Sequence, residues 1–565
     1  MLSVIVILLG IILYAIAYWG YVKWFDRNVI MSDPKRETPA HTYMDGVEFF
    51  PTNKYVLFGF QWKSIAALGP VLGPIIGVQW GWLPALLWIL FGTIFIGWIH
   101  DYGSLMVSAR SEGASFGPIT YELVSPRART ILLWYILWYI ILILSSFTNV
   151  VAGLFRSYPV SPIPVLIVTL IGVLAGFMTY KLKVNIVYTT IIAVIVMFLG
   201  IWAGIAQPFR VPLPATGPFP NALDFWMFIT LLFCFLGAVL PIWVFIQPIN
   251  YLSFYLVYSG VIGIIIGAII GAPNFSQTAT TTFWTTGKWV NSAAIGPLWP
   301  MMFVTIACGA ISGWHSLIGS SITSKQLDTE PDAHFIGGGA MLAEGILATV
   351  ALVTCAILSP SLVETTAAGS VFVKGGSQLL GYIGISETVG NALTSVMLII
   401  LAITIMHIGL RITRLVLSDL GGPRFGGIFK NMYFSAILVC IIVYLITSPH
   451  VGAVFSYIWG TFGGANQLMA GLALMIVSLW LTKEKRPTIY TVIPMLFMLA
   501  TTLSALAYLT YSGITGYIAD PSKIGALIAA IVNIFLLILG LFMCYEGAKA
   551  FQRLRAKPKE ETAKT

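Results

Sequence analysis

Long stretches without a charged residue constrain the fold of this chain more than any other feature. Only 9% of its 565 residues are charged and 58% are hydrophobic, whereas an ordinary soluble domain is about 25% charged. A helix of roughly 20 apolar residues is long enough to cross the hydrocarbon core of a bilayer. The sequence therefore predicts an all-α, polytopic membrane protein with no room for a large soluble domain, which excludes a soluble enzyme.

The apolar stretches, broken at clusters of Pro, Gly and charge, divide into about fifteen predicted transmembrane helices. They cover residues 2–22, 64–80, 82–107, 130–152, 163–180, 186–206, 225–247, 254–272, 299–320, 338–359, 391–410, 432–448, 451–481, 489–511 and 524–547. We expect three parts: an N-terminal helix with a cytoplasmic linker (1–63), a transport core (64–410), and a four-helix extension with a basic tail (411–565).

The basic residues set the predicted orientation. With the N-terminus outside and the C-terminus inside, 25 of the 30 Lys and Arg residues face the cytoplasm, as the positive-inside rule requires. The net charge of +9 therefore marks cytoplasmic loops, and we expect no nucleic-acid partner.

Neither a cofactor nor a metal site is predicted. The five cysteines lie in apolar stretches and show no CxxC spacing. A haem would need histidines paired across helices, and His100, His315 and His407 form no evident pair. The glycine-rich loop 421–427 lacks the Lys-Ser/Thr that a phosphate-binding loop needs.

Two predicted spans contain residues that interrupt a helix. These are Gly69, Pro70, Gly73 and Pro74 in the first span, and Gly237 and Pro241 in the second. The two spans are five segments apart and cross the membrane in opposite directions. Interrupted helices at corresponding positions of two inverted repeats mark the substrate site of secondary transporters. We therefore predict inverted five-helix repeats in which these six residues bind substrate. Ordinary proline kinks are the alternative.

Ionisable and hydroxyl side chains at membrane depth are candidates for ion coupling. Glu344 lies among glycines and alanines in the span 338–359, and an intramembrane carboxylate is a functional candidate by default. His315 lies in the span 299–320, where Ser312 and Ser316 form a polar stripe at helical spacing. A structural carboxylate and a packing histidine are the alternatives.

Charges near the predicted cytoplasmic surface are candidates for gating. Arg411 and Arg414 follow His407 on one helix face, with Asp419 beyond them, and Asp101 ends the span 82–107. Arginines that extend to the membrane surface as anchors are the alternative explanation.

Several different motifs are spread along residues 1–480. They include Asp45-Gly46, Pro51-Thr52-Asn53-Lys54, Leu57-Phe58-Gly59, Gly69-Pro70, Gly73-Pro74, Gly81-Trp82-Leu83-Pro84, His100-Asp101, Gln247-Pro248, Ile306 to Gly313 with His315-Ser316, Gly337 to Glu344, Asp419-Leu420 and Ala465-Asn466-Gln467-Leu468. In these motifs the chain resembles the carbon starvation protein A family of prokaryotic peptide transporters. Two departures stand out. Family members carry paired histidines where this chain has Phe60-Gln61, and Arg-Asp where it has Ile249-Asn250.

The resemblance implies a multi-pass transporter of the prokaryotic cytoplasmic membrane that imports peptides when preferred carbon is scarce. Some relatives take up pyruvate together with protons. The resemblance also implies kinship with the amino acid–polyamine–organocation superfamily and its inverted repeats. The leading hypothesis is ion-coupled peptide symport, with a proton or sodium as the partner ion. Uptake of pyruvate or another small monocarboxylate, and a starvation sensor without transport, are the alternatives.

Overall fold

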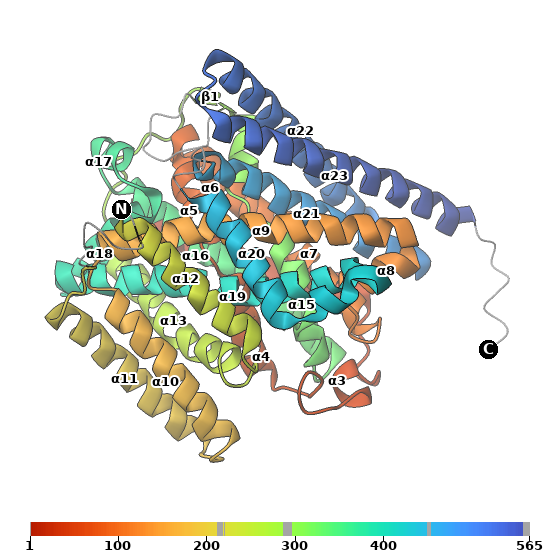
Figure 1. Ribbon diagram of the computed structural model, residues 1–565, viewed down its shortest axis with the longest axis horizontal. Coiled ribbons are helices and arrows are strands. Elements are labelled where there is room, and N and C mark those ends of the chain that lie inside the picture. The colour runs from red at the N-terminus through yellow and green to blue at the C-terminus, as the bar shows by residue number, and fades with distance from the viewer. Residues whose placement is uncertain (1, 212–218, 220, 286–295, 449–453, 557–565) are drawn as a thin grey trace.

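Runs of apolar residues with few interior prolines form helices along almost the whole chain, as Figure 1 shows. The computed structural model describes residues 2–211, 219, 221–285, 296–448 and 454–556. The first helices are α1 (Leu2–Ile16), α2 (Lys23–Phe25), α3 (Pro39–Thr42), α4 (Lys54–Ile65), α5 (Gly69–Gly77), α6 (Trp82–Gly92), α7 (Trp98–Ala109) and α8 (Phe116–Leu123). They are followed by α9 (Pro126–Ser157), α10 (Pro162–Tyr180), α11 (Ile186–Ala206), α12 (Ala222–Val239), α13 (Ile246–Gly271), α14 (Phe303–Thr305) and α15 (Gly313–Ser321).

The C-terminal part is also helical. It holds α16 (Ala340–Ala356), α17 (Pro360–Thr365), α18 (Ala368–Gly381), α19 (Glu387–Lys430), α20 (Met432–Thr447), α21 (Phe455–Lys483), α22 (Ile489–Ala519) and α23 (Ile524–Ala556). Short π-helical and 3-10 turns extend or join these helices: η1 (Ala17–Val22), η2 (Asp26–Ile30), η3 (Val78–Trp80), η4 (Thr93–Gly97), η5 (Leu298–Met302), η6 (Thr323–Lys325), η7 (Glu330–Asp332) and η8 (His334–Gly339). The strands β1 (Trp284–Thr285) and β2 (Gly296–Pro297) pair antiparallel.

The described part of the chain contains twelve helices long and apolar enough to cross a membrane, or thirteen if the bent pair α4–α5 is one span. Of the fifteen predicted spans, two do not correspond to any of these thirteen. One corresponds to α20, which has only 16 residues, and the other, 299–320, is interrupted between α14 and α15. The chain is thus an all-α polytopic membrane protein.

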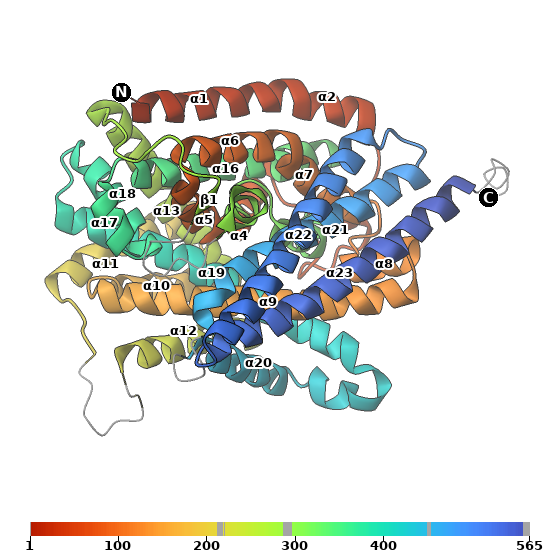
Figure 2. The same cartoon turned by 90° about the horizontal axis from the view of Figure 1, so that it is seen from above.

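The most buried helices form the centre of the molecule. The apolar parts of α19 and α21 are buried along their whole length, whereas only 28% of the apolar part of α11 is buried. Figure 1 shows α10 and α11 at one edge and α22 and α23 at another. In Figure 2, α1 runs along one face and α20 along the opposite face. Exposed apolar side chains on these outer helices suit contact with lipid.

The predicted interruption near Gly69 exists but lies earlier in the chain. The axes of α4 and α5 differ by 49° across a break at residues 66–68, and the first broken span begins at Lys54, not at residue 64. Gly69 and Pro70 begin α5, where a proline needs no backbone donor. The stretch 69–77 that we expected to unwind is therefore helical.

The second predicted interruption is wrong. Gly237 lies inside α12, and the exposed Pro241 lies in the turn that joins α12 to α13. These helices are two separate spans. Pro241 marks a connection between two spans, because a turn tolerates a residue without a backbone N–H more easily than a helix interior does.

Candidate functional site

Two non-helical segments lie close to the start of α5 in the interior of the protein. One is the break at residues 66–68, and the other is the segment 306–312 between α14 and α15. Glycines let the two chains approach closely. A Cβ on Gly69 would overlap Cys308 Sγ, and a Cβ on Gly73 would lie 2.8 Å from the carbonyl oxygen of Thr305. The interrupted region of the second span therefore sits against the start of α5.

Side chains from distant helices satisfy the backbone of these two breaks. The indole of Trp314 donates to the carbonyl oxygen of Ser64 at 2.8 Å, and Thr93 Oγ1 donates to that of Gly309 at 3.1 Å. Asn466 Oδ1 accepts from Ser312 Oγ at 3.1 Å, from Trp314 N at 3.3 Å and from a tyrosine hydroxyl on α9. Irregular backbone at membrane depth is tolerated only where such partners exist.

A chain of four ionisable side chains lies directly beside the breaks. Asp101 on α7 accepts from His100 Nδ1 at 2.7 Å and from His315 Nδ1, on α15, at 2.8 Å. His315 Nε2 lies 3.1 Å from Glu344 Oε2 on α16. The side chains of all four residues are fully buried. We name Asp101, His315 and Glu344 the membrane triad.

The membrane triad leaves one side of its histidine unsatisfied. An ionised carboxylate can only accept, so Asp101 fixes the Nδ1 proton of His315 and leaves Nε2 toward Glu344. Although Nε2 and Oε2 are at ion-pair distance, they lack the alignment of a hydrogen bond, and both Glu344 oxygens are without hydrogen-bond partners among the described residues. The arrangement can hold a proton at either atom.

The sequence singled out three of these groups but not their connection. Glu344 and His315 were predicted to couple ions, whereas Asp101 was predicted to gate and lies between two histidines. Ser312 belongs to the Asn466 cluster, while Ser316 donates to the carbonyl oxygen of Gly313 in its own helix. Serines thus do not line an open polar stripe here. His100 and His315 formed no evident pair in the sequence, and the structure joins them through Asp101.

The predicted gating residues do not meet one another. Arg411 donates to the carbonyl oxygen of Leu240 at 3.0 Å, and Arg414 donates to that of Ala238 at 2.9 Å. Both arginines therefore cap the C-terminal end of α12, where the helix dipole favours cations. Asp419 lies 3.4 Å from Arg129 on α9, and its side chain is about half exposed.

Lys63 is a buried charge that sequence reasoning missed. Its side chain is fully buried near the end of α4, and its Nζ lies 2.5 Å from Thr404 Oγ1 on α19. Residue 63 fell outside the predicted span 64–80 and was counted with the cytoplasmic charges. The sequence signal that Lys63 is buried was the largely apolar run on its N-terminal side, from Tyr55 to Trp62.

Two cavities are lined by the helices that flank the break, one by α5 and the other by α4. One has a volume of about 410 Å³ and is lined by Leu72 and Ile76 of α5, together with residues of α9. The other has a volume of about 460 Å³ and is lined by Phe60 of α4, Leu317 of α15 and Ile408 of α19. Neither cavity reaches the membrane triad.

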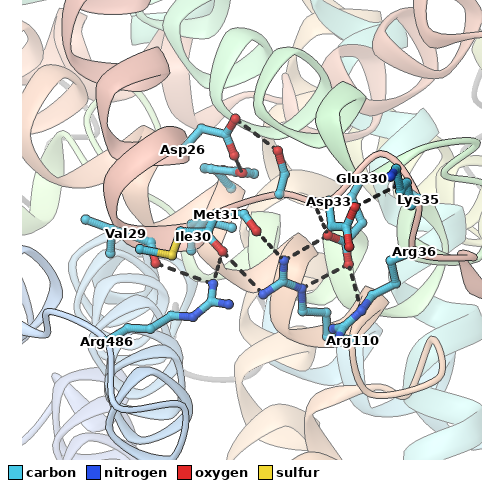
Figure 3. A network of polar contacts seen from close by, with 12 residues as sticks. Asp26, Val29, Ile30, Met31, Asp33, Lys35, Arg36, Arg110, Glu330 and Arg486 are labelled. Atoms are coloured by element: carbon cyan, nitrogen blue, oxygen red, sulfur yellow. Dashed lines mark hydrogen bonds and ion pairs between the residues drawn. The ribbon is translucent and has the colours of Figure 1, made fainter.

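A second acid–base cluster lies at the far end of α7, in the region predicted to face the cytoplasm (Figure 3). Glu330 accepts from Arg110 through both oxygens, at 2.9 and 2.8 Å, and from the backbone N–H of Asp33 at 2.8 Å. Arg110 also donates to the carbonyl oxygen of Met31 at 2.9 Å, and Arg486 donates to that of Ile30. We name Arg110, Glu330 and Asp33 the surface clamp.

A helical membrane protein whose broken spans meet beside buried ionisable groups belongs to the class of membrane transporters. Comparison with known proteins identifies the family. Residues 2–378 and 359–505 match the family model described as "Carbon starvation protein CstA", and the chain belongs to this family. It is therefore a transporter and not an enzyme.

Named relatives come from several bacteria. The "Peptide transporter CstA" of Escherichia coli (strain K12) is 29% identical over 93% of this chain and 84% of its own length. That of Bacillus subtilis (strain 168) is 27% identical over 98% of both chains. The "Pyruvate/proton symporter BtsT" of Escherichia coli (strain K12) is 33% identical over 63% of this chain, which spans about half the length of that relative.

Solved structures of other transporters also align with the chain. A manganese transporter of Eremococcus coleocola aligns with a TM-score of 0.49 at 12% identity, over 90% of this chain and 99% of its own. MhsT in complex with L-phenylalanine aligns with a TM-score of 0.47 at 14% identity, over 86% of this chain and 99% of its own.

Proposed function

We propose that this protein is a secondary active importer that takes up peptides in symport with protons across the cytoplasmic membrane, in response to carbon starvation. The observation that carries the proposal is the membrane triad beside two broken segments. The names of the relatives that match most of the chain support a peptide substrate. Pyruvate is the second candidate, because a relative at 33% identity is named a pyruvate/proton symporter.

Protons suit the membrane triad better than sodium does. A histidine nitrogen binds a proton near neutral pH, whereas a hard cation prefers a cage of oxygen ligands. With His315 charged and both acids ionised, the triad carries one net negative charge. One further proton on Glu344 neutralises it. A neutral cluster is cheaper to enclose in a low-dielectric interior, so proton binding would favour one conformation over another.

We infer that the transport core consists of two inverted repeats, with the second break at 306–312. The first unit would comprise α4–α5, α6–α7, α9, α12 and α13, with the peripheral pair α10 and α11 inserted. The second would comprise α14–α15, α16, α19, α20 and α21. Counterparts touch one another in four of the five positions: α5 with α14, α6 with α16, α9 with α19, and α12 with α20. Contacts between counterparts support a two-fold relation. The predicted boundaries at 64 and 410 then move outward.

Uptake by the purified protein in liposomes tests the proposed function. We expect labelled dipeptides to accumulate when an inward proton gradient is imposed and not when only a sodium gradient is imposed. Accumulation of pyruvate without dipeptides would favour the second candidate. Movement that ignores both gradients would contradict symport, and a protein that moves no solute in any arm would instead favour the sensor alternative.

A further inference from the structure

We propose that Lys63 binds the carboxylate group of the transported substrate, whether a peptide C-terminus or a small monocarboxylate. The proposal deepens the proposed function and rests on it for the identity of the ligand as a transported solute. Three features support the proposal. They are the surroundings of Lys63, a cavity whose walls lie one helical turn from those surroundings, and a hydrogen bond that connects this region to the membrane triad.

Lys63 has no counter-charge within the described ranges of the chain. Thr404 Oγ1 is its hydrogen-bond partner at 2.5 Å, and this hydroxyl donates its own proton to the carbonyl oxygen of Ile400 at 2.6 Å. Among the residues that the structure describes, no carboxylate lies at ion-pair distance from the ammonium. Burying an ammonium with one neutral partner is costly, whereas a carboxylate at the same place would supply both charge and acceptors.

His407 adds a second unsatisfied polar group next to this lysine. It follows Thr404 by three residues on α19, so the two side chains share a helix face. The imidazole is fully buried and stacks on the ring of Phe233 with centroids 5.6 Å apart. Neither ring nitrogen has a hydrogen-bond partner in the described residues. On the helix face that it shares with Thr404, the imidazole would offer a donor to a second oxygen of the bound carboxylate.

The 460 Å³ cavity is lined by sequence neighbours of the residues around Lys63, and not by Lys63 itself. Three of its walls lie one helical turn from the proposed site: Phe60 precedes Lys63 on α4, Leu317 follows Trp314 on α15, and Ile408 follows Thr404 on α19. These spacings of three or four residues keep each pair on one helix face. The charged lining of this cavity is mixed, with Arg411 and Lys325 beside Glu48, Glu112 and Asp419, so the cavity does not select an anion and the selection falls to Lys63.

The proposed site is joined to the membrane triad by one hydrogen bond. The indole of Trp314 donates to the carbonyl oxygen of Ser64 at 2.8 Å. Ser64 follows Lys63 directly, and His315 follows Trp314 directly. A carboxylate that shifts the end of α4 therefore acts on the residue beside the proton site. This connection gives a physical route by which substrate and proton binding depend on each other.

Binding and transport by the variants Lys63→Met and Lys63→Arg test the proposal, with Lys183→Met as the matched control because Lys183 is exposed. The probes are pyruvate, a dipeptide with a free C-terminus, and the same dipeptide with an amidated C-terminus. Ligand-induced shifts of the melting temperature in detergent measure binding without transport. Methionine matches the length of the lysine side chain without its charge, so we expect Lys63→Met to fold and to elute from a sizing column as the wild type does.

We expect Lys63→Met to weaken binding and uptake of the carboxylate probes at least tenfold. Lys63→Arg should keep part of the affinity, Lys183→Met should equal the wild type, and the amidated dipeptide should bind poorly to every variant. A wild type that binds the carboxylates without transporting them would refute the proposed function and leave the inference standing. Lys63→Met with wild-type affinity, or a wild type that binds neither carboxylate probe, would overturn the inference.

Discussion

The membrane triad and the surface clamp lie near opposite ends of the same helix, α7, and differ in how fully their polar atoms are satisfied. In the surface clamp, both Glu330 oxygens accept from Arg110, and one of them also accepts from the backbone of Asp33. In the membrane triad, Glu344 faces His315 at 3.1 Å without a formed hydrogen bond. Both carboxylates are almost completely buried.

This difference is the one that the proposed function predicts between a structural pair and a coupling site. A bidentate arginine–carboxylate pair is rigid and geometrically specific. Burial opposes the charge of Arg110, but the Glu330 carboxylate outweighs it and raises the pKa of the guanidinium, so Arg110 stays charged at every physiological pH. The membrane triad instead combines a histidine with a carboxylate that has unused acceptor capacity. Such a site can change its proton content, which is what ion coupling requires.

The largest effect on stability is expected from Glu330→Gln. This change leaves Arg110, whose side chain is only 4% exposed, without its counter-charge, and breaking a buried pair costs roughly 3 kcal/mol. Thermal unfolding in detergent measures it. The matched control is Glu122→Gln, because Glu122 pairs with Lys483 at 2.7 Å in an exposed position and should cost less than about 1 kcal/mol. Equal losses in the two variants would mean that the surface clamp does not hold the fold.

Sequence was sufficient for thirteen of the fifteen predicted membrane spans because hydropathy is a local property. The apolar run of the span 524–547, for example, lies within α23, whatever the rest of the chain does. Contacts between residues far apart in the chain could not be predicted in this way. Asp101 and His315 are 214 positions apart, and no spacing rule connects them.

The position of the second break also could not be predicted from the sequence alone. Pro241 gave a strong local signal and marks a turn between helices. The segment 306–312 has no proline. Thr93 donates to its carbonyl oxygen at Gly309, and Asn466 accepts from the Ser312 hydroxyl and from the backbone N–H of Trp314 at the start of α15. Tertiary partners decide where a helix can unwind, and a local pattern does not reveal them.

The membrane triad should respond to mutation in the opposite way from the surface clamp. We expect Glu344→Gln to reduce proton-driven accumulation at least tenfold, about 1.4 kcal/mol of coupling free energy, while exchange of substrate across the liposome membrane continues. Because Glu344 lacks hydrogen-bond partners, its replacement should leave the melting temperature unchanged or slightly raised. Accumulation equal to that of the wild type would remove Glu344 from the coupling mechanism. Glu330→Gln, tested in parallel, should transport normally per folded molecule.

The smallest effects are expected at the residues first considered as a gate. Arg411→Gln removes a charge from the C-terminal end of α12 and should cost about 1 kcal/mol. Asp419→Asn weakens a partly exposed pair with Arg129 and should cost only a few tenths of a kcal/mol. Since the two side chains have different partners, their effects on unfolding and on uptake should add in the double variant to within about 0.5 kcal/mol. A larger coupling between them would mean that the two side chains meet in another conformation of the transport cycle and form the gate that this conformation lacks.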